Sequence, residues 1–520
     1  MIMEMQNYTN YHKNTTFAIS ILSHQLIILK SPFSILNSFM INITTKIHDQ
    51  FSIEFKVGFE GSEHDAESNF KVNSWIFVPN NLGINASTYS KEQFYRDVKS
   101  NIRLITPNFT LAEMVSGEKS PLALLQQVVD RHQAQPESIH DLEFQVKMFC
   151  AIFKSALRDA TNKILKSAAG DIPTSVPADL VEEVSRITHA YRQLIQEYDG
   201  NEFVPTVFLH GDEYISHLIG IQAAKLLRFM ETHPEIDFGD ARSKLQQLIR
   251  QEVAYKESMC YSYITPHDDK ANQDLVYKHG LLKKYIESAL YLKQDTTNDG
   301  AAMKEITFSI AAGFAMLVST LIAWPFQKYL GSYPLLIFVI LIVAYMFKDR
   351  IKDFARNLFV HRLKSKYFDH KTTIHFKEEK IGWIKEGMDF INDAKTPEKV
   401  LYLRNRSSLE ADNTLQQERT ILYRKQVQID NRNLRNRYEY RFDGIHDIMR
   451  FHIQEYTRKM DDPTLLVDSL TEAGALESVP TLRVYIIHII LQFIHEEETE
   501  YRGFRITATR DGIVACEEVK

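Results

Sequence analysis

The feature that most constrains this chain is a block of 42 residues, Ile306 to Phe347, in which Lys328 is the only ionised side chain. A helix of that length would be roughly 63 Å long, about twice the ~30 Å hydrocarbon core of a bilayer. Prolines and a glycine near the middle of the block interrupt a single helix. The block therefore predicts two transmembrane helices, residues 306–326 and 329–347. A helical hairpin buried in a large core is the alternative.

Positive charge follows the block and sets the predicted orientation. The seven cations on this flank are Lys348, Arg350, Lys352, Arg356, Arg362, Lys364 and Lys366. We expect them on the cytoplasmic side, in a basic amphipathic helix over 348–367 that faces anionic membrane lipid. Because two spans return the chain to its starting side, both termini are predicted to be cytoplasmic. The predicted location is the inner membrane of a prokaryote.

The first predicted span carries small side chains on one side. They are Ser309, Ala311, Gly313, Ala315 and Ser319. Small residues let two helix backbones approach closely, so this face is predicted to pack against another helix. That helix is either the second span or the same span of another protomer.

The predicted fold class is an α+β membrane protein, in which the hairpin separates two folded regions. A leader over residues 1–39 is read as an upstream extension, so that the working protein begins at Met40. The regions that follow are a small β-rich domain (40–115), a helical domain (116–300), the hairpin (306–347), the basic helix (348–367) and an antiparallel α+β domain (368–520).

Local patterns predict several elements within these regions. Residues 51–60 and 70–79 alternate apolar and polar side chains on either side of a polar stretch, which predicts a β-hairpin. Residues 444–463 are predicted to form a helix that ends at Asp-Asp-Pro. The apolar run 484–494 is too short to cross a bilayer and predicts a buried central strand. Asp511-Gly512 predicts a hairpin turn.

The most regular helical pattern runs from Leu180 to Tyr198. Its apolar residues are Leu180, Val184, Ile187, Tyr191, Leu194 and Tyr198, in alternating steps of four and three. Such a seam is compatible with a coiled coil that joins two copies or a protein partner. Six positions fall short of a sustained heptad repeat, so a helix bundle within one chain is the alternative.

The sequence contains few signs of chemistry. Glycine-rich phosphate loops, zinc motifs and nucleophile elbows are absent, and no catalytic residue or cofactor is predicted. The nearest approach to a metal site is "HGDEYISH", where His210, Glu213 and His217 are weak candidate ligands; Glu213 and His217 share a helix face. A helix cap and a surface histidine explain the same residues without a metal. A net charge of −6 argues against a nucleic-acid partner.

These observations predict a function in interaction rather than catalysis. We expect a membrane-tethered scaffold or signalling protein with cytoplasmic domains. An enzyme whose site is assembled from residues distant in sequence is one alternative, and a small oligomeric pore is another.

Overall fold

The computed structural model describes residues 42–62, 65–134, 139–166, 176–199, 204–234, 236, 238–329, 334–364, 368–405, 417–436 and 439–519. The chain divides into two units, Met1–Met40 and Ile41–Lys520, and all described residues belong to the second. The predicted leader, residues 1–39, lies outside the described residues.

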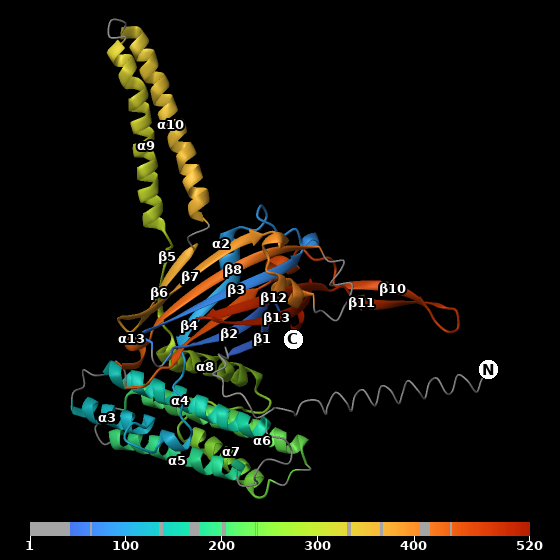
Figure 1. The fold of residues 1–520 in the computed structure, drawn as a ribbon. Coiled ribbons are helices and arrows are strands. Elements are labelled where there is room, and N and C mark those ends of the chain that lie inside the picture. The colour runs from blue at the N-terminus through green and yellow to red at the C-terminus, as the bar shows by residue number, and fades with distance from the viewer. Residues whose placement is uncertain are drawn as a thin grey trace. The chain divides into compact units, whose positions relative to one another are not determined.

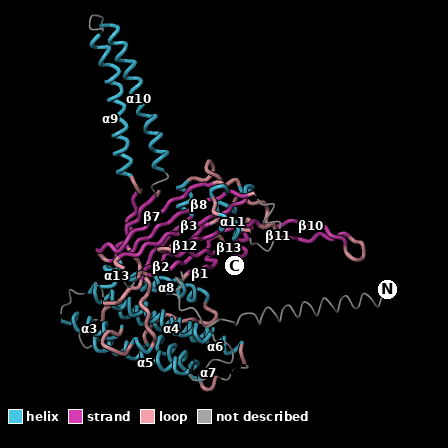
Figure 2. Tube along the Cα trace, viewed as in Figure 1, coloured by secondary structure: helices cyan, strands magenta, loops and turns pink. Residues whose placement is uncertain are grey.

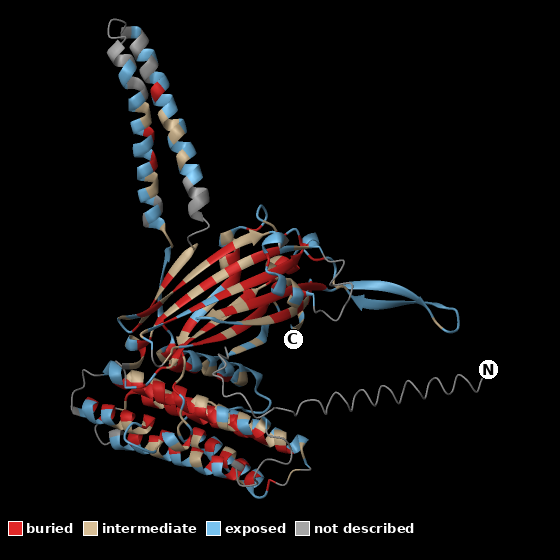
Figure 3. Cartoon of the chain, viewed as in Figure 1, coloured by how far each residue is buried: buried red, intermediate tan, exposed pale blue. Residues whose placement is uncertain are grey.

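The largest element of the fold is an eight-stranded antiparallel sheet (Figures 1 and 2). In spatial order its strands are β14 (Gly512–Val519), β13 (Glu498–Thr509), β12 (Tyr485–His495), β3 (Glu67–Pro79), β8 (Glu418–Asp430), β7 (Glu379–Ile391), β6 (His370–Phe376) and β5 (Lys293–Asn298). Figure 3 shows that burial concentrates in its central strands. β12 is buried from Tyr485 to Leu491, as predicted for a central strand.

A second, four-stranded antiparallel sheet packs against the first. Its order is β1 (Ile43–Asp49), β2 (Ser52–Glu60), β9 (Gly444–His452) and β4 (Val98–Leu104). Aromatic rings join the two sheets: Phe55 contacts Phe504 with ring centroids 5.3 Å apart, and Phe59 contacts Phe70 at 5.2 Å. The core therefore lies between the sheets.

Short helices complete this β region. Ser90 caps α2 (Lys91–Asp97) through a reciprocal hydrogen-bond pair with Gln93. α11 (Glu398–Arg404) covers the other face of the large sheet, where Val400 packs against Trp75 and Ile490. α13 (Asn431–Asn436) and α14 (Gln454–Thr457) connect strands.

The region between β4 and β5 folds into a helical bundle. Its helices are α3 (Pro121–Ala134), α4 (Ile139–Lys166), α5 (Val176–Asp199), α6 (Thr206–Thr232), α7 (Ala241–Ser258) and α8 (Asp269–Glu287). The predicted seam on α5 is buried inside this bundle at Leu180, Val184, Ile187, Tyr191 and Leu194. The structure thus has the helix bundle within one chain that the sequence left as the alternative to a coiled coil.

The two predicted membrane spans are wrong. Helices α9 (Ala301–Tyr329) and α10 (Pro334–Lys364) do form at this place and pack against each other. Among the residues that the structure describes, however, none of the helices is both long enough and apolar enough to cross a membrane.

Three further predictions rested on these spans and are corrected with them. They are the membrane part of the fold class, the inner-membrane location, and the two-pass topology with both termini cytoplasmic. The α+β architecture with antiparallel sheets is what the structure has. β5 and β6 pair with each other, so α9 and α10 are an insertion between two neighbouring strands.

The β regions also differ from the expected division into domains. β3 lies between β12 and β8, so strands from 40–115 and from 368–520 share sheets. The predicted hairpin of 51–60 with 70–79 is wrong, because β2 and β3 belong to different sheets. The predicted helix over 444–463 is also wrong. Its first half is β9, which is held between β2 and β4, and backbone pairing on both sides outweighs the helical spacing of its apolar residues.

Candidate functional site

The most unusual surface of this molecule is a two-stranded ribbon, β10 (Thr464–Leu470) with β11 (Leu476–Leu482), which we call the arm. It forms a sheet of its own, and each of its 14 strand residues is exposed (Figure 3). Seven of these are large apolar residues with exposed fractions between 44 and 71%: Leu465, Leu466, Val467, Leu470, Leu476, Val479 and Leu482.

Both faces of the arm are apolar. Val467 lies opposite Val479 on one face, and Leu470 lies opposite Leu476 on the other. Because side chains alternate between the faces of a ribbon, neither face is a solvated polar surface. A globular partner that covered one face would leave apolar side chains on the other.

The root of the arm is fixed although its strands are exposed. The Tyr485 hydroxyl donates to Asp461 Oδ2 at 2.9 Å, and Arg483 pairs with the same carboxylate at 3.2 Å. The backbone N–H of Arg483 donates to the carbonyl of Pro463 at 2.8 Å. At the tip, Gly474 has a positive φ of 78° that closes the turn. The arm is therefore a formed ribbon held at its base.

The arm is also acidic. Between Thr464 and Leu482 it has three acids, Asp468, Glu472 and Glu477, and no Lys or Arg; at its root, Asp461 and Asp462 pair with Arg483 and Arg510. No element predicted from the sequence corresponds to the arm, although alternating apolar residues flank a glycine-containing turn directly after Asp-Asp-Pro.

The three candidate metal ligands on α6 each contact a different residue. The His210 ring contacts Tyr285 with centroids 5.5 Å apart, Glu213 pairs with Lys278 at 2.6 Å, and His217 lies against His279. Within the described part of the chain, no group of three or more His, Cys, Asp or Glu side chains is arranged to hold a metal ion.

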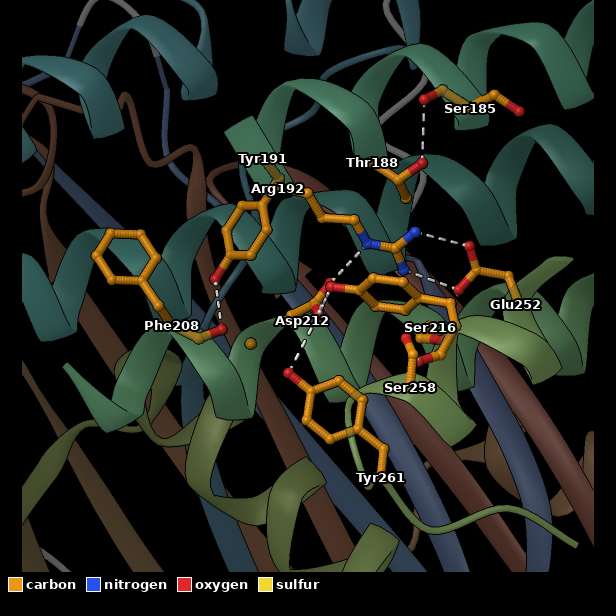
Figure 4. A network of polar contacts seen from close by, with 12 residues as sticks. Ser185, Thr188, Tyr191, Arg192, Phe208, Asp212, Ser216, Glu252, Ser258 and Tyr261 are labelled. Carbon is orange, nitrogen blue, oxygen red and sulfur yellow. Dashed lines mark hydrogen bonds and ion pairs between the residues drawn. The ribbon is translucent and has the colours of Figure 1, made fainter. Parts of the chain in front are cut away.

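The neighbouring Asp212 is the centre of a buried polar network in the bundle (Figure 4). It accepts hydrogen bonds from Arg192 Nε at 3.0 Å and from the hydroxyls of Tyr255 at 2.7 Å and Tyr261 at 3.1 Å. Arg192 also donates two hydrogen bonds to Glu252, at 3.1 and 2.9 Å. Arg192 thus bridges two carboxylates and ties α5, α6 and α7 together.

Next to this network, His217 of α6 and His279 of α8 have ring centroids 3.4 Å apart. Burial, together with His279 and Lys256, lowers the pKa of His217 to about 4. Burial, together with Lys256 and Lys278, lowers the pKa of His279 to about 4 as well. Both rings are therefore neutral at pH 7.

The small side chains on α9 face α10 in part. Ala311 and Ala315 are buried, and Ser319 Oγ donates to the carbonyl of Ala344 on α10 at 3.0 Å. Ser309 and Gly313 are exposed. The small-residue face is thus used at least in part within the chain.

Two of the predicted lipid-facing cations contact aromatic rings. Lys348 lies 4.1 Å from the ring centroid of Tyr345, and Arg356 lies 4.2 Å from that of Phe308. Arg350 and Lys352 are exposed, while the side chains of Arg362, Lys364 and Lys366 lie outside the described residues. Contact with anionic lipid is not tested by these distances and stays a prediction.

A polar cleft of about 450 Å³ lies at one end of the four-stranded sheet. In it Ser52 Oγ is 2.9 Å from His452 Nδ1, although the two residues are 400 positions apart. His452 Nε2 faces Gln454 Oε1 at 3.2 Å, an amide where a catalytic triad has a carboxylate. The pair therefore differs from a Ser-His-Asp triad, in which a carboxylate orients the histidine.

No family model, curated protein or solved structure matches this chain. The arrangement of its own residues is thus the basis for any functional proposal.

Proposed function

We propose that this chain is a non-catalytic interaction protein, a scaffold or signalling component, which binds a protein partner through the arm. The single observation that carries the proposal is the complete exposure of β10 and β11 with their seven large apolar side chains. Large exposed apolar patches mark interaction surfaces in folded proteins.

The physical argument concerns the stability of the ribbon. A two-stranded hairpin is at best marginally stable in water, and one that packs on no other layer gains little from burial. Both outer edges of the arm carry unpaired backbone groups that a partner strand can use. An occupant that covers both faces, or that adds a strand to one edge, supplies contacts that the described residues of the chain do not make with the arm.

Charge specifies the chemistry of this partner. Three acids and no Lys or Arg lie between Thr464 and Leu482. Pairing of two arms from two copies would bring like charges together, which is unfavourable. The surface that fits is an apolar groove or strand edge of a different protein, rimmed by Lys and Arg.

The alternatives from the sequence receive less support. The pore required the two membrane spans and is set aside with them. An enzyme would need an oriented nucleophile or acid–base pair, and Ser52 with His452 has an amide in place of the orienting carboxylate.

Site-specific photocrosslinking in cells tests the proposal. A benzophenone amino acid replaces Leu466, which is 65% exposed, in the full chain. We expect one discrete adduct heavier than the chain. The same probe at Tyr402, which is 63% exposed and outside the arm, is the matched control and should give none.

Charge reversal distinguishes specific binding from nonspecific hydrophobic association. Asp468→Lys with Glu477→Lys should abolish the adduct at Leu466 while the melting temperature stays unchanged. No adduct, or equal adducts at Leu466 and Tyr402, would show that the arm is not a docking element. An adduct of two copies of this chain would contradict the argument from charge.

A further inference from the structure

A lysine and two carboxylates meet in the core between the sheets. Lys425 on β8 and Asp447 on β9 come from different sheets, and Lys425 Nζ contacts Asp447 Oδ2 directly. Both residues are buried, with exposed fractions of 4% and 3%. A fully buried lysine is rare in folded proteins, so this contact requires an explanation.

The third group is Glu386 on β7. It lies directly opposite Lys425 in the β7–β8 register, with Oε1 3.1 Å from Nζ. The Tyr423 hydroxyl donates to Glu386, and the Tyr423 ring packs on Phe94 with centroids 5.3 Å apart. Aromatic side chains thus shield the cluster on this side.

A hydroxyl completes the cluster on the side of Asp447. Ser100 of β4 donates through Oγ to Asp447 Oδ1, and Lys425 Nζ lies 3.3 Å from the same hydroxyl. A donor at Oδ1 stabilises negative charge that develops on this oxygen when Cγ is attacked. The amine, the acyl carbon and a second carboxylate are therefore preassembled.

We propose that Lys425 and Asp447 condense to an isopeptide bond that joins the two sheets, with Glu386 as the group that moves the proton. This inference concerns a covalent modification and goes beyond the proposed function.

The reaction balances without any other reactant. Proton transfer along the Nζ···Oδ2 contact gives a neutral amine and a carboxylic acid. The Nζ lone pair attacks Cγ, and Glu386 accepts a proton from the nitrogen and returns it to the departing hydroxyl. The Nζ–Cγ bond forms, the Cγ–O bond breaks, and one water leaves.

Electrostatics favour the role of Glu386 as the base and oppose the role of Lys425 as a free amine. Burial raises the pKa of the Glu386 carboxyl. The Lys425 charge and the hydrogen bonds from Tyr423 and Lys425 lower this pKa by more, so that it lies below its usual value. Glu386 therefore rests as the base. Burial lowers the pKa of Lys425, yet Asp447 and Glu386 raise it above its usual value. The ammonium is the resting form, and the free amine has to form within the contact with Asp447.

Mass spectrometry of the purified full chain tests the bond. After trypsin, peptides 425–432 and 442–450 should leave as one branched species, lighter than their sum by one water. Lys91 and Asp369 form the control pair, since their contact of 2.6 Å is partly exposed and should yield unmodified peptides.

Two variants assign the roles of the side chains. Glu386→Gln should leave the peptides separate in a chain that still unfolds cooperatively. Asp447→Asn should lose ammonia instead of water and give a branched product of the same mass as the wild type. Separate peptides from folded wild-type chain would overturn the proposal and leave a buried ion cluster. Branching that persists in Glu386→Gln would remove Glu386 from the mechanism and overturn the proposal in that part.

Discussion

Replacement of Asp212 by Asn should destabilise the helical bundle more than any change of similar size on its surface. Asp212 is fully buried and accepts hydrogen bonds from Arg192, Tyr255 and Tyr261. The amide keeps the shape but removes the charge opposite Arg192. Breaking a buried pair in this way costs about 3–5 kcal/mol when the remaining charge has no other partner.

The network lowers that figure, because Arg192 keeps its two hydrogen bonds to Glu252. We therefore expect a loss of about 3 kcal/mol in the free energy of unfolding of the helical bundle. For a bundle of the size of α3 to α8, this corresponds to a fall of about 10 °C in the melting temperature. Circular dichroism at a helical wavelength follows the transition.

A matched control and a double-mutant cycle define the outcome. Asp240→Asn removes an exposed carboxylate that pairs with Lys244, and should cost less than about 1 kcal/mol. Combining Asp212→Asn with Glu252→Gln should give a non-additive loss, because both carboxylates serve one guanidinium. If Asp212→Asn and Asp240→Asn have the same melting temperature, the network contributes no stability and the expected loss is refuted.

Two further predictions concern packing and protonation in the bundle. Gly211→Ala should destabilise it by about 1–3 kcal/mol, since the added Cβ would lie 2.4 Å from the Tyr191 hydroxyl. Gly220→Ala on the same helix meets nothing within 4 Å and should stabilise it; chemical denaturation that ranks the two variants the other way would contradict this. The pKa values near 4 of His217 and His279 mean that the unfolded chain binds protons that the folded chain excludes between about pH 6.5 and 4. The free energy of unfolding should therefore decrease as the pH is lowered through that window. The expected loss at pH 5 is about 1 kcal/mol per histidine, after allowance for partial exposure. His217→Gln should flatten a profile of melting temperature against pH; an unchanged profile would contradict this.

Local patterns in the sequence predicted elements better than partners. The alternation in 51–60 and 70–79 marks two real strands, β2 and β3, but nothing local shows that each pairs with strands that lie hundreds of residues away. Isoleucines in 484–494 predicted a buried strand because burial on both faces needs apolar side chains throughout. The apolar spacing in β9 predicts a helix, whereas its pairing with β2 and β4 depends on strands that lie far earlier in the sequence.

The functional residues were harder to predict. "HGDEYISH" was singled out for metal ligands, yet Asp212 serves a salt-bridge network whose partner Glu252 is 40 positions further along the chain. Lys425, Glu386 and Asp447 come from three strands, and no spacing in the sequence indicates that they meet. The arm could have been read from its alternation and its glycine, but its complete exposure is a property of the folded chain.

Hydrogen exchange of the purified chain tests whether the arm has support within its own chain. We expect amides of β10 and β11 to exchange within seconds to minutes at low and high protein concentration alike, while those of β12 stay protected. Protection of the arm comparable to that of β12 at low concentration would show that it packs within the chain. Protection that appears only at high concentration would show that a second copy covers it, and either result would contradict a dedicated partner.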